Sequence, residues 1–433
     1  MLCAPNTKKD YHKMKDKLLE MFFEKERWTA AIHKAYDKGI DKGVLYQLST
    51  PEGRAALYLN IKEGRYVIDP PHVASIPKDT PGEFRTVFVN EPLDRVFLSI
   101  ANDLLFDTCR DMIHPSCKSY LRGTGCGDTV RKASALIVAA APHNAGWKSD
   151  LSKYFDTVPI EHIDRCFDAV QQRTGHSVIL DIIRRYYHSD LMYDEHGKLV
   201  EHYQSLKQGC SVASFLADAI LYDIDKALAE EYDGLYVRYS DDMLFIGRRY
   251  EEAMRCLRDE LAKMNMSLNS KKIEYVDAQH WFKFLGFSIR GDIISLSRKG
   301  LEKVAREVRR RTVCQYRQGL AKAAHSVQRY LYHGCEDHSW ADTHLRYINC
   351  TPDIAALNAY ILDCIRACGT RQRHVGGIGY NPTANGCFQR HKGSSVAFNR
   401  SHTDKNIEGY TSLAAARNAM LCSRSAYQAL TAF

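Results

Sequence analysis

Three aspartates lie in the two segments of this sequence that are best suited to chemistry. Asp241 and Asp242 are adjacent in RYSDDMLF (238–245), where apolar residues flank them. Asp150 lies in SDLSKYFDTVP (149–159). Carboxylates beside a core are costly unless a cation neutralises them, and Mg²⁺ prefers carboxylate oxygens. If the three side chains meet, they can hold two divalent ions for an in-line displacement at phosphorus.

Short strands are predicted to position these carboxylates. Residues 147–151 have the pattern of a short strand that ends near Asp150. Residues 235–239 and 243–247 form two apolar strands, which we expect to be joined by a tight turn at the two adjacent aspartates. Such a turn is also typical of an ordinary solvated hairpin. The segment 149–159, in which Phe155 comes five residues after Asp150, favours a catalytic metal site over an ordinary hairpin.

The whole chain has the length and composition of a folded protein with more than one unit. It has 433 residues, of which 45% are apolar and 26% charged, so it is too apolar to be disordered. Helical and strand patterns alternate as far as a boundary near 290–297, and the pattern is then helical to about residue 368. We therefore expect an α+β fold followed by an all-helical part.

Positive charge is concentrated in one predicted helix. The net charge is +8, and residues 298–317 hold eight Lys and Arg against two Glu. Such a segment favours a polyanionic partner. The side chains expected to form a stripe of phosphate contacts are Lys303, Arg306, Arg309 and Arg310. A solvated helix face is the alternative.

Two further features bear on location and partners. The longest apolar run, 135–141, is about a third of the length of a membrane span. We therefore expect a cytoplasmic protein without membrane contact. Residues 369–409 are rich in Gly and Asn and carry six Lys and Arg, so they could fold upon a structured RNA or be a plain linker.

Seven blocks between about residues 76 and 310 together resemble a bacterial reverse transcriptase. The blocks, in order, are Arg85 with DRVF (94–97), SYLRGTG (119–125), Asp150–Asp156, KQGCSVASFLAD (207–218), YSDD (239–242), LNSKK (268–272) and FKFLGFSI (282–289). The resemblance implies a right-hand polymerase fold of the α+β class, with a small antiparallel sheet. Its implied parts are N-terminal helices and fingers (1–146), palm (147–292), helical thumb (293–368), and a basic tail with a terminal helix (369–433).

The resemblance also implies roles for individual residues. Asp150, Asp241 and Asp242 would be catalytic and hold two Mg²⁺ ions, for which Mn²⁺ can substitute, together with the backbone carbonyl of Leu151. Lys272 would be the catalytic acid that gives a proton to pyrophosphate. The residues implied to bind the incoming nucleotide and nascent base pair are Arg85, Lys78, Phe155, Gln208 and Gly209; among them, Phe155 would exclude a ribose 2′-hydroxyl.

The lineage implied is that of defence-associated enzymes. Ala213 and Ser214 stand where Ser-Pro is usual, as in the unknown-group and abortive-infection reverse transcriptases, which are related to those of retrons and group II introns. The expected function is RNA-directed DNA synthesis on a structured non-coding RNA, from dNTPs to a DNA product, in anti-phage defence. Two alternatives remain open, namely an untemplated or protein-primed DNA polymerase and a non-catalytic RNA-binding scaffold. The oligomeric state is not predicted.

Overall fold

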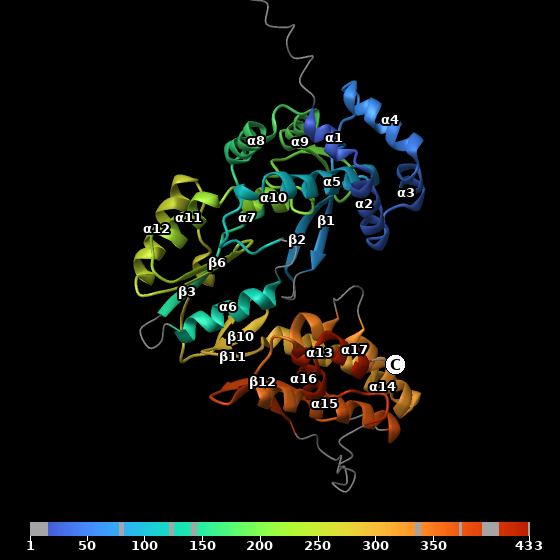
Figure 1. The fold of residues 1–433 in the computed structure, drawn as a ribbon, viewed down its shortest axis with the longest axis vertical. Coiled ribbons are helices and arrows are strands. Elements are labelled where there is room, and N and C mark those ends of the chain that lie inside the picture. The colour runs from blue at the N-terminus through green and yellow to red at the C-terminus, as the bar shows by residue number, and fades with distance from the viewer. Residues whose placement is uncertain are drawn as a thin grey trace, which may run out of the picture. The chain divides into compact units, whose positions relative to one another are not determined.

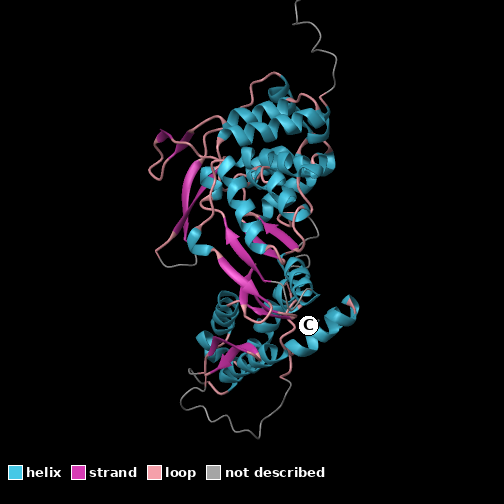
Figure 2. Ribbon diagram, turned by 90° about the vertical axis from the view of Figure 1, so that its left-hand side faces the viewer, coloured by secondary structure: helices cyan, strands magenta, loops and turns pink. Residues whose placement is uncertain are grey.

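The computed structural model describes residues 16–77, 82–120, 125–139, 145–333, 339–371, 375–391 and 407–431. The chain divides into two compact units. Unit 1 comprises residues 1–120, 149–231 and 252–272, and unit 2 comprises residues 121–148, 232–251 and 273–433. Helices predominate in both units and the strands form small sheets, so the fold class is α+β, as predicted (Figure 2).

Unit 1 is a set of helices with one four-stranded sheet. Its sheet has the order β2-β1-β4-β5, in which β1 and β2 are antiparallel. The strands are β1 (His72–Pro77), β2 (Phe84–Val89), β4 (Leu191–Tyr193) and β5 (Leu199–Glu201). The helices are α1 (Lys17–Phe22), α2 (Lys25–Asp37), α3 (Lys42–Ser49), α4 (Pro51–Lys62), α5 (Pro92–Thr108), η1 (Arg110–Met112), α7 (Tyr154–Thr157), α8 (Ile160–Thr174), α9 (Val178–Tyr187), α10 (Ala213–Ala219), α11 (Tyr222–Glu230), most of α12 (Tyr250–Lys263), and η2 (Ser270–Lys272).

Local sequence explains why these helices begin where they do. The Thr50 hydroxyl accepts a hydrogen bond from Gly53 N at 3.1 Å, and Pro51 occupies the first turn of α4. The C-terminal end of α1 packs on α5 through an aromatic contact. Phe22 lies 4.9 Å from Phe97, measured between ring centroids, and both side chains are fully buried. This cluster fixes α5, which precedes the predicted site segments.

Unit 2 contains most of the palm sheet and a helical bundle. The palm sheet has the order β6-β7-β3-β8, with strands β3 (Ala145–Asp150), β6 (Leu235–Tyr239), β7 (Asp242–Ile246) and β8 (Glu274–Asp277). A second sheet has the order β11-β10-β9, with strands β9 (Phe282–Phe284), β10 (Phe287–Arg290) and β11 (Ile293–Leu296). The helices are α6 (Cys126–Ala139), α13 (Arg298–Arg311), η3 (Val313–Gln318), α14 (Leu320–Tyr332), the π-helix η4 (Ala341–Leu345), α15 (Thr351–Gly369), α16 (Leu413–Cys422) and α17 (Arg424–Thr431).

The helical bundle of unit 2 has a continuous apolar core. Val304 and Val308 of α13, Val327 and Leu331 of α14, and Ile361 of α15 are all fully buried in one cluster. These residues recur at helical spacing, so each helix presents one apolar face to the others. The three helices lie together within unit 2 (Figure 1). The sequence-based prediction of helices between residues 298 and 368 is confirmed.

Residues 369–409 are not entirely a loop, contrary to the interpretation of the sequence. β12 (Ile378–Thr383) and β13 (Gly386–Arg390) form an antiparallel hairpin. The buried Asp353 carboxylate of α15 holds it, because it accepts hydrogen bonds from Cys387 N at 2.9 Å and Phe388 N at 2.8 Å. The Gly-rich composition hides this hairpin because its support comes from a distant helix.

One structural finding concerns membranes. Among the helices of the described residues, none is both long and apolar enough to cross a bilayer.

Candidate active site

Asp150 is the last residue of β3 and is nearly buried, with 8% of its surface exposed. Its carboxylate forms an ion pair with Lys272, with 2.5 Å between Oδ2 and Nζ. The backbone carbonyl of Asp150 accepts a hydrogen bond from Asn269 N at 2.8 Å, which brings η2 against this strand end. Unit 1 therefore brings together the predicted catalytic carboxylate and the predicted catalytic acid.

Leu151, whose carbonyl was predicted as a metal ligand, is held beside the same segment. It forms an isolated antiparallel bridge with Leu268, and its side chain is buried. Ser152 N also donates a hydrogen bond to Ser267 O at 2.9 Å. The backbone after Asp150 is thus fixed by residues 267–269.

Asp241 and Asp242 lie at the turn of the β6–β7 hairpin in unit 2. Tyr239 pairs with Asp242, which leaves Ser240 and Asp241 as the two turn residues. Ser240 has a φ of +58°, the left-handed conformation that such short hairpins require. The turn therefore lies one residue earlier than predicted, and Asp242 is the first residue of β7.

Arg238 is a residue of this hairpin that the sequence reasoning missed. Its side chain is fully buried, and its Nη1 donates a hydrogen bond to the carbonyl of Ser240 at 3.2 Å. A buried guanidinium requires such partners, so Arg238 fixes the backbone of the turn that carries Asp241. The signal that could have revealed it is an arginine between Val237 and Tyr239, three residues before the aspartate pair, in a strand that is otherwise apolar.

The donor chemistry of the three aspartates fits a divalent cation. All three offer carboxylate oxygens, the ligands that Mg²⁺ prefers, and no softer ligand accompanies them. Within the part of the chain that the structure describes, no three Asp, Glu, His or Cys side chains gather closely enough to hold an ion. The Asp150 carboxylate is instead neutralised by the Lys272 ammonium.

Phe155 and the segment around Gly209 lie together in unit 1. Phe155 is half-buried in α7, and its carbonyl accepts a hydrogen bond from Leu206 N at 3.2 Å. The carbonyl of Gln208 accepts a hydrogen bond from Phe88 N of β2 at 2.7 Å. The backbone thus connects three predicted substrate-binding segments, which carry Phe155, Gln208 with Gly209, and β2.

Gly209 is required by its backbone conformation and by its close neighbour. Its φ is +112°, and a Cβ built on it would lie 2.7 Å from the carbonyl oxygen of Phe88. An L-amino acid is strained at this φ, and the atom in contact is backbone that cannot turn aside. The close backbone approach that this glycine permits in the structure is to strand β2.

Lys207 is a second residue whose role was not predicted. Its side chain is only 1% exposed, and its Nζ donates hydrogen bonds to Ser189 O at 2.8 Å and to Gln204 Oε1 at 2.9 Å. Burial lowers the pKa of Lys207 to about 8. The ammonium also lies 4.9 Å from the centre of the Tyr186 ring, so this cation fixes the loop before Gln208.

The remaining predicted nucleotide-binding residues are two cations. Arg85 is exposed on β2, opposite Ile76 of β1, and among the described residues it has no side-chain partner. Lys78 lies outside the described residues. The guanidinium of Arg85 is thus accessible to an anion.

The predicted basic stripe on α13 contains side chains in different environments. Lys303 and Arg306 are exposed. Arg310 is also exposed, but Glu307 accepts two hydrogen bonds from it, at 2.8 and 2.7 Å. Arg309 is half-buried. Lys303 and Arg306 are therefore the most accessible of the four.

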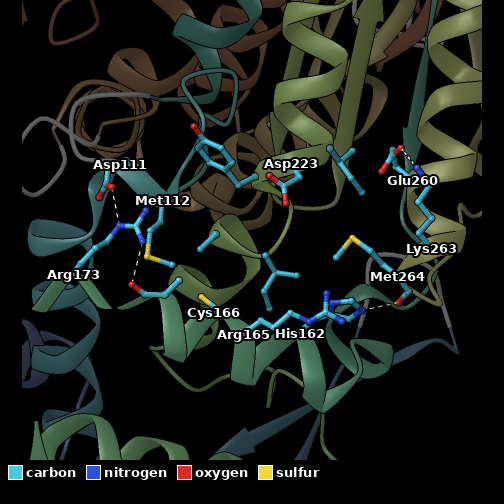
Figure 3. A pocket seen from close by; sticks show the side chains of 15 residues that line it. Asp111, Met112, His162, Arg165, Cys166, Arg173, Asp223, Glu260, Lys263 and Met264 are labelled. Atoms are coloured by element: carbon cyan, nitrogen blue, oxygen red, sulfur yellow. Dashed lines mark hydrogen bonds and ion pairs between the residues drawn. The ribbon is translucent and has the colours of Figure 1, made fainter. Parts of the chain in front are cut away.

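Unit 1 also has a cavity of about 540 Å³, separate from every predicted site residue. An Arg173–Asp111 ion pair of 2.8 Å stands at one end and Lys263 with Glu260 at the other, and Cys166 lies between them (Figure 3). Acidic and basic side chains balance around it. The cavity therefore has no charge preference that points to a nucleic acid.

Comparison with known proteins defines the class of this domain. Residues 76–289 match the family described as reverse transcriptase (RNA-dependent DNA polymerase). Residues 76–289 therefore form a reverse transcriptase domain, the type of domain that RNA-dependent DNA polymerases, a class of nucleotidyltransferase, use for catalysis. Such domains use divalent metal ions. The predicted reverse transcriptase domain is confirmed, and the matched residues include all three aspartates, whereas the bacterial, defence-associated lineage stays a prediction.

The solved structures that resemble this chain include fungal telomerases. One is apo telomerase from Candida tropicalis, with 13% identity and a TM-score of 0.46, covering 70% of this chain and 58% of that chain. Another is telomerase from Candida albicans in complex with a TWJ fragment of telomeric RNA, with 13% identity and a TM-score of 0.45, covering 72% and 56%. This chain thus spans less than two thirds of either length. No curated protein matches it.

Proposed function

We propose that this protein is an RNA-directed DNA polymerase that extends a primer with dNTPs. The observation that carries the proposal is the reverse transcriptase match over residues 76–289, which contains Asp150, Asp241 and Asp242. The palm sheet order supports it, because β3 ends at Asp150, β7 begins at Asp242, and the two strands are neighbours. The proposed cofactor is a pair of Mg²⁺ ions held by these carboxylates and by the carbonyl of Leu151.

Each of the chain's own groups has a distinct task in this proposal. When bound, the two ions would lower the pKa of the primer 3′-hydroxyl and stabilise the departing pyrophosphate. Lys272, which is already at Asp150, supplies the proton that pyrophosphate takes up. Arg238 holds the backbone of the turn, so Asp241 is positioned before substrate arrives.

The substrate contacts follow from the connected segments of unit 1. Arg85 and Lys78 bind the triphosphate, and bidentate contacts from Arg85 orient it. Phe155 blocks the space of a ribose 2′-hydroxyl and so selects dNTPs. Gln208 and Gly209 lie against the nascent base pair. In the thumb, Lys303, Arg306, Arg309 and Arg310 contact the phosphates of the template–primer duplex.

The proposed template is a structured non-coding RNA, and the proposed setting is anti-phage defence in the cytoplasm. Support comes from the departure at Ala213 and Ser214, which resembles the defence-associated lineages. Sequencing of the nucleic acid that co-purifies with the protein tests the proposed template. A discrete RNA with its complementary DNA is the expected result.

A primer-extension assay tests the polymerase proposal. The purified protein is given an RNA template, a DNA primer, dNTPs and Mg²⁺, and is compared with Asp241→Asn and with the control Asp292→Asn, an exposed aspartate of the same unit. We expect extension to fall at least about 100-fold in Asp241→Asn, since a lost metal ligand removes several kcal/mol of transition-state stabilisation. The control should retain wild-type activity.

Other outcomes of this assay favour the alternatives. DNA made without RNA would indicate an untemplated polymerase, and DNA covalently attached to the protein would indicate protein priming. RNA binding without any synthesis, in wild type and variant alike, would indicate a scaffold. Each of these results would overturn RNA-templated extension as the function.

A further inference from the structure

A basic cavity of about 650 Å³ lies on α14 of unit 2. The side chains that line it are Arg311, Lys322, His325, Ser326, Arg329 and His333. Among the described residues that line it, none carries a carboxylate. The α13 residues to which the proposed function assigns duplex binding do not line this cavity. The basic cavity is therefore a separate feature, and the function proposed above leaves it unexplained.

The helical period of α14 creates this surface. Lys322 and Arg329 are two turns apart and exposed on one side of the helix. Ala323, Val327 and Leu331 occupy the other side and are fully buried in the core of the bundle. Because the apolar side anchors the helix, the basic side must face outward. Changes to the exposed cations therefore leave the core untouched.

The charges of the basic cavity are only partly compensated within the described residues. Arg311 is held by Glu307, with 2.6 Å between Nε and Oε1, and its guanidinium lies 5.2 Å from the centre of the Tyr330 ring. Lys322 and Arg329 have no side-chain partner among the described residues. Lys322 and Arg329 lie on the same side of α14, two turns apart, and an anion bound in the cavity offsets their positive charge.

The shape and chemistry of the cavity favour phosphate groups on a strand. A concave site of this volume admits a nucleotide-sized group, whereas a flat charged face would contact only the backbone phosphates along the outside of a duplex. The guanidinium fork of Arg311 is fixed in advance by Glu307 and Tyr330, which lowers the ordering cost of a bidentate phosphate contact. Ser326 adds a hydroxyl donor at the same place.

We propose that the basic cavity on α14 binds phosphate groups of an RNA strand, at a second site beside the proposed duplex contacts of α13. The inference rests on the proposed function in one respect, that RNA is the partner of this chain. It assigns Lys322 and Arg329 as the principal phosphate contacts and Arg311 as a pre-ordered third. Either internal phosphodiesters or a 5′-terminal phosphate can supply the ligand.

Binding of a short unprimed RNA to the full chain tests this site. The probe is a fluorescent single-stranded RNA, made with either a 5′-phosphate or a 5′-hydroxyl, and anisotropy is measured over a range of salt. Lys322→Gln with Arg329→Gln is compared with a matched control that removes the same charges from exposed positions of unit 2, Lys132→Gln with Arg346→Gln. Circular dichroism melts check that both variants fold.

The expected result is a specific loss of affinity. Each phosphate contact on a single strand contributes about 0.7 to the salt slope, so two lost contacts weaken binding about 25-fold at about 0.1 M salt and lower the slope by about 1.4. A 5′-phosphate that strengthens binding to wild type, but not to the α14 variant, would identify the terminal group. Equal binding of the two RNAs to wild type would identify internal phosphodiesters.

Two results would overturn the inference. One is wild-type affinity and salt slope in the α14 variant, and the other is an equal loss in the control variant, which would indicate a general effect of charge. Primer extension by the same preparations separates this test from the proposed function. Failure of wild type to extend a primer counts against the polymerase proposal alone, since the binding assay contains no primer and no dNTP.

Discussion

Replacing Gly209 with alanine tests whether the close approach of this loop to β2 is needed for the fold of unit 1. The φ of +112° lies outside the conformations that alanine adopts readily, and left-handed backbone costs an L-residue about 1–2 kcal/mol. The new Cβ would also lie 2.7 Å from the Phe88 carbonyl oxygen. To relieve that contact, the loop must move from β2 and weaken the hydrogen bond from Phe88 N to Gln208 O, worth about 1 kcal/mol. We expect Gly209→Ala to destabilise the protein by about 3 kcal/mol or more.

Gly197 provides the matched control for this substitution. It has a φ of +75° in the β4–β5 hairpin of the same unit, and a Cβ there would have no neighbour within 4 Å. Gly197→Ala therefore incurs only the cost of placing alanine at a positive φ, about 1–2 kcal/mol. Both substitutions lower the entropy of the unfolded chain by the same amount, so that effect cancels when the two variants are compared. Urea unfolding followed by circular dichroism measures both variants. Destabilisation of the two within about 0.5 kcal/mol of each other would refute the argument from close approach.

Three further predictions concern a buried lysine, an ion pair and substrate selection. Burial lowers the pKa of Lys207 from 10.5 to about 8. Between these two pH values the folded chain therefore binds fewer protons than the unfolded chain, so the free energy of unfolding rises with pH. We expect this group to add up to about 2 kcal/mol to the stability of the wild type between about pH 7.5 and pH 9.5. Urea midpoints should show this gain as the difference in pH dependence between wild type and Lys207→Met; parallel curves would contradict it. Hydrogen bonds from Arg310 and Arg311 lower the pKa of Glu307 to about 2. At about pH 6, Glu307→Gln should therefore be less stable than wild type by about 1 kcal/mol. This difference in stability should shrink as the pH falls below about 4.5, because Glu307 then becomes protonated in the unfolded chain. A difference that stays constant down to about pH 3.5 would exclude this linkage. Phe155→Val should raise incorporation of ribonucleotides relative to deoxyribonucleotides at least about tenfold in primer extension, and an unchanged ratio would remove Phe155 from substrate selection.

Elements with a strong local pattern were predictable from the sequence. The alternation in FRTVFV predicts the strand that the structure places at Phe84–Val89. The helical spacing of apolar residues around 160–174 likewise predicts the helix that the structure places at Ile160–Thr174, α8. Interruptions of such elements were less visible. Residues 282–289 form two strands because Leu285 and Gly286 adopt positive φ between them, yet their apolar character suggests one strand. A run of apolar residues indicates that a segment is buried, but it does not indicate a backbone turn within that segment.

The chemistry of the site was predictable in type but not in its supporting contacts. Motif resemblance indicated Asp150 and Lys272 as separate functional residues, while their ion pair joins positions 122 residues apart in the chain. The same is true of the approach of Gly209 to Phe88 and of the burial of Lys207. These contacts depend on the packing of distant segments, and residue types and spacing carry no direct signal of it.

The ion pair between Asp150 and Lys272 has a consequence for metal binding. A nearly buried carboxylate is costly without a cation, and Lys272 supplies one, yet its own side chain is 56% exposed and can leave for solvent. Mg²⁺ must then compete with this ammonium for Asp150. Lys272→Met should lower the half-saturating Mg²⁺ concentration about two- to fivefold, since a partly exposed pair is worth up to about 1 kcal/mol. The loss of the acid should lower the rate at saturating Mg²⁺ about 100-fold. Mg²⁺ titration of primer extension measures both effects, and Lys271→Met, at the exposed neighbouring position, is the control. An unchanged Mg²⁺ dependence in Lys272→Met would show that the lysine does not compete for this carboxylate, and an unchanged rate would show that it is not the acid.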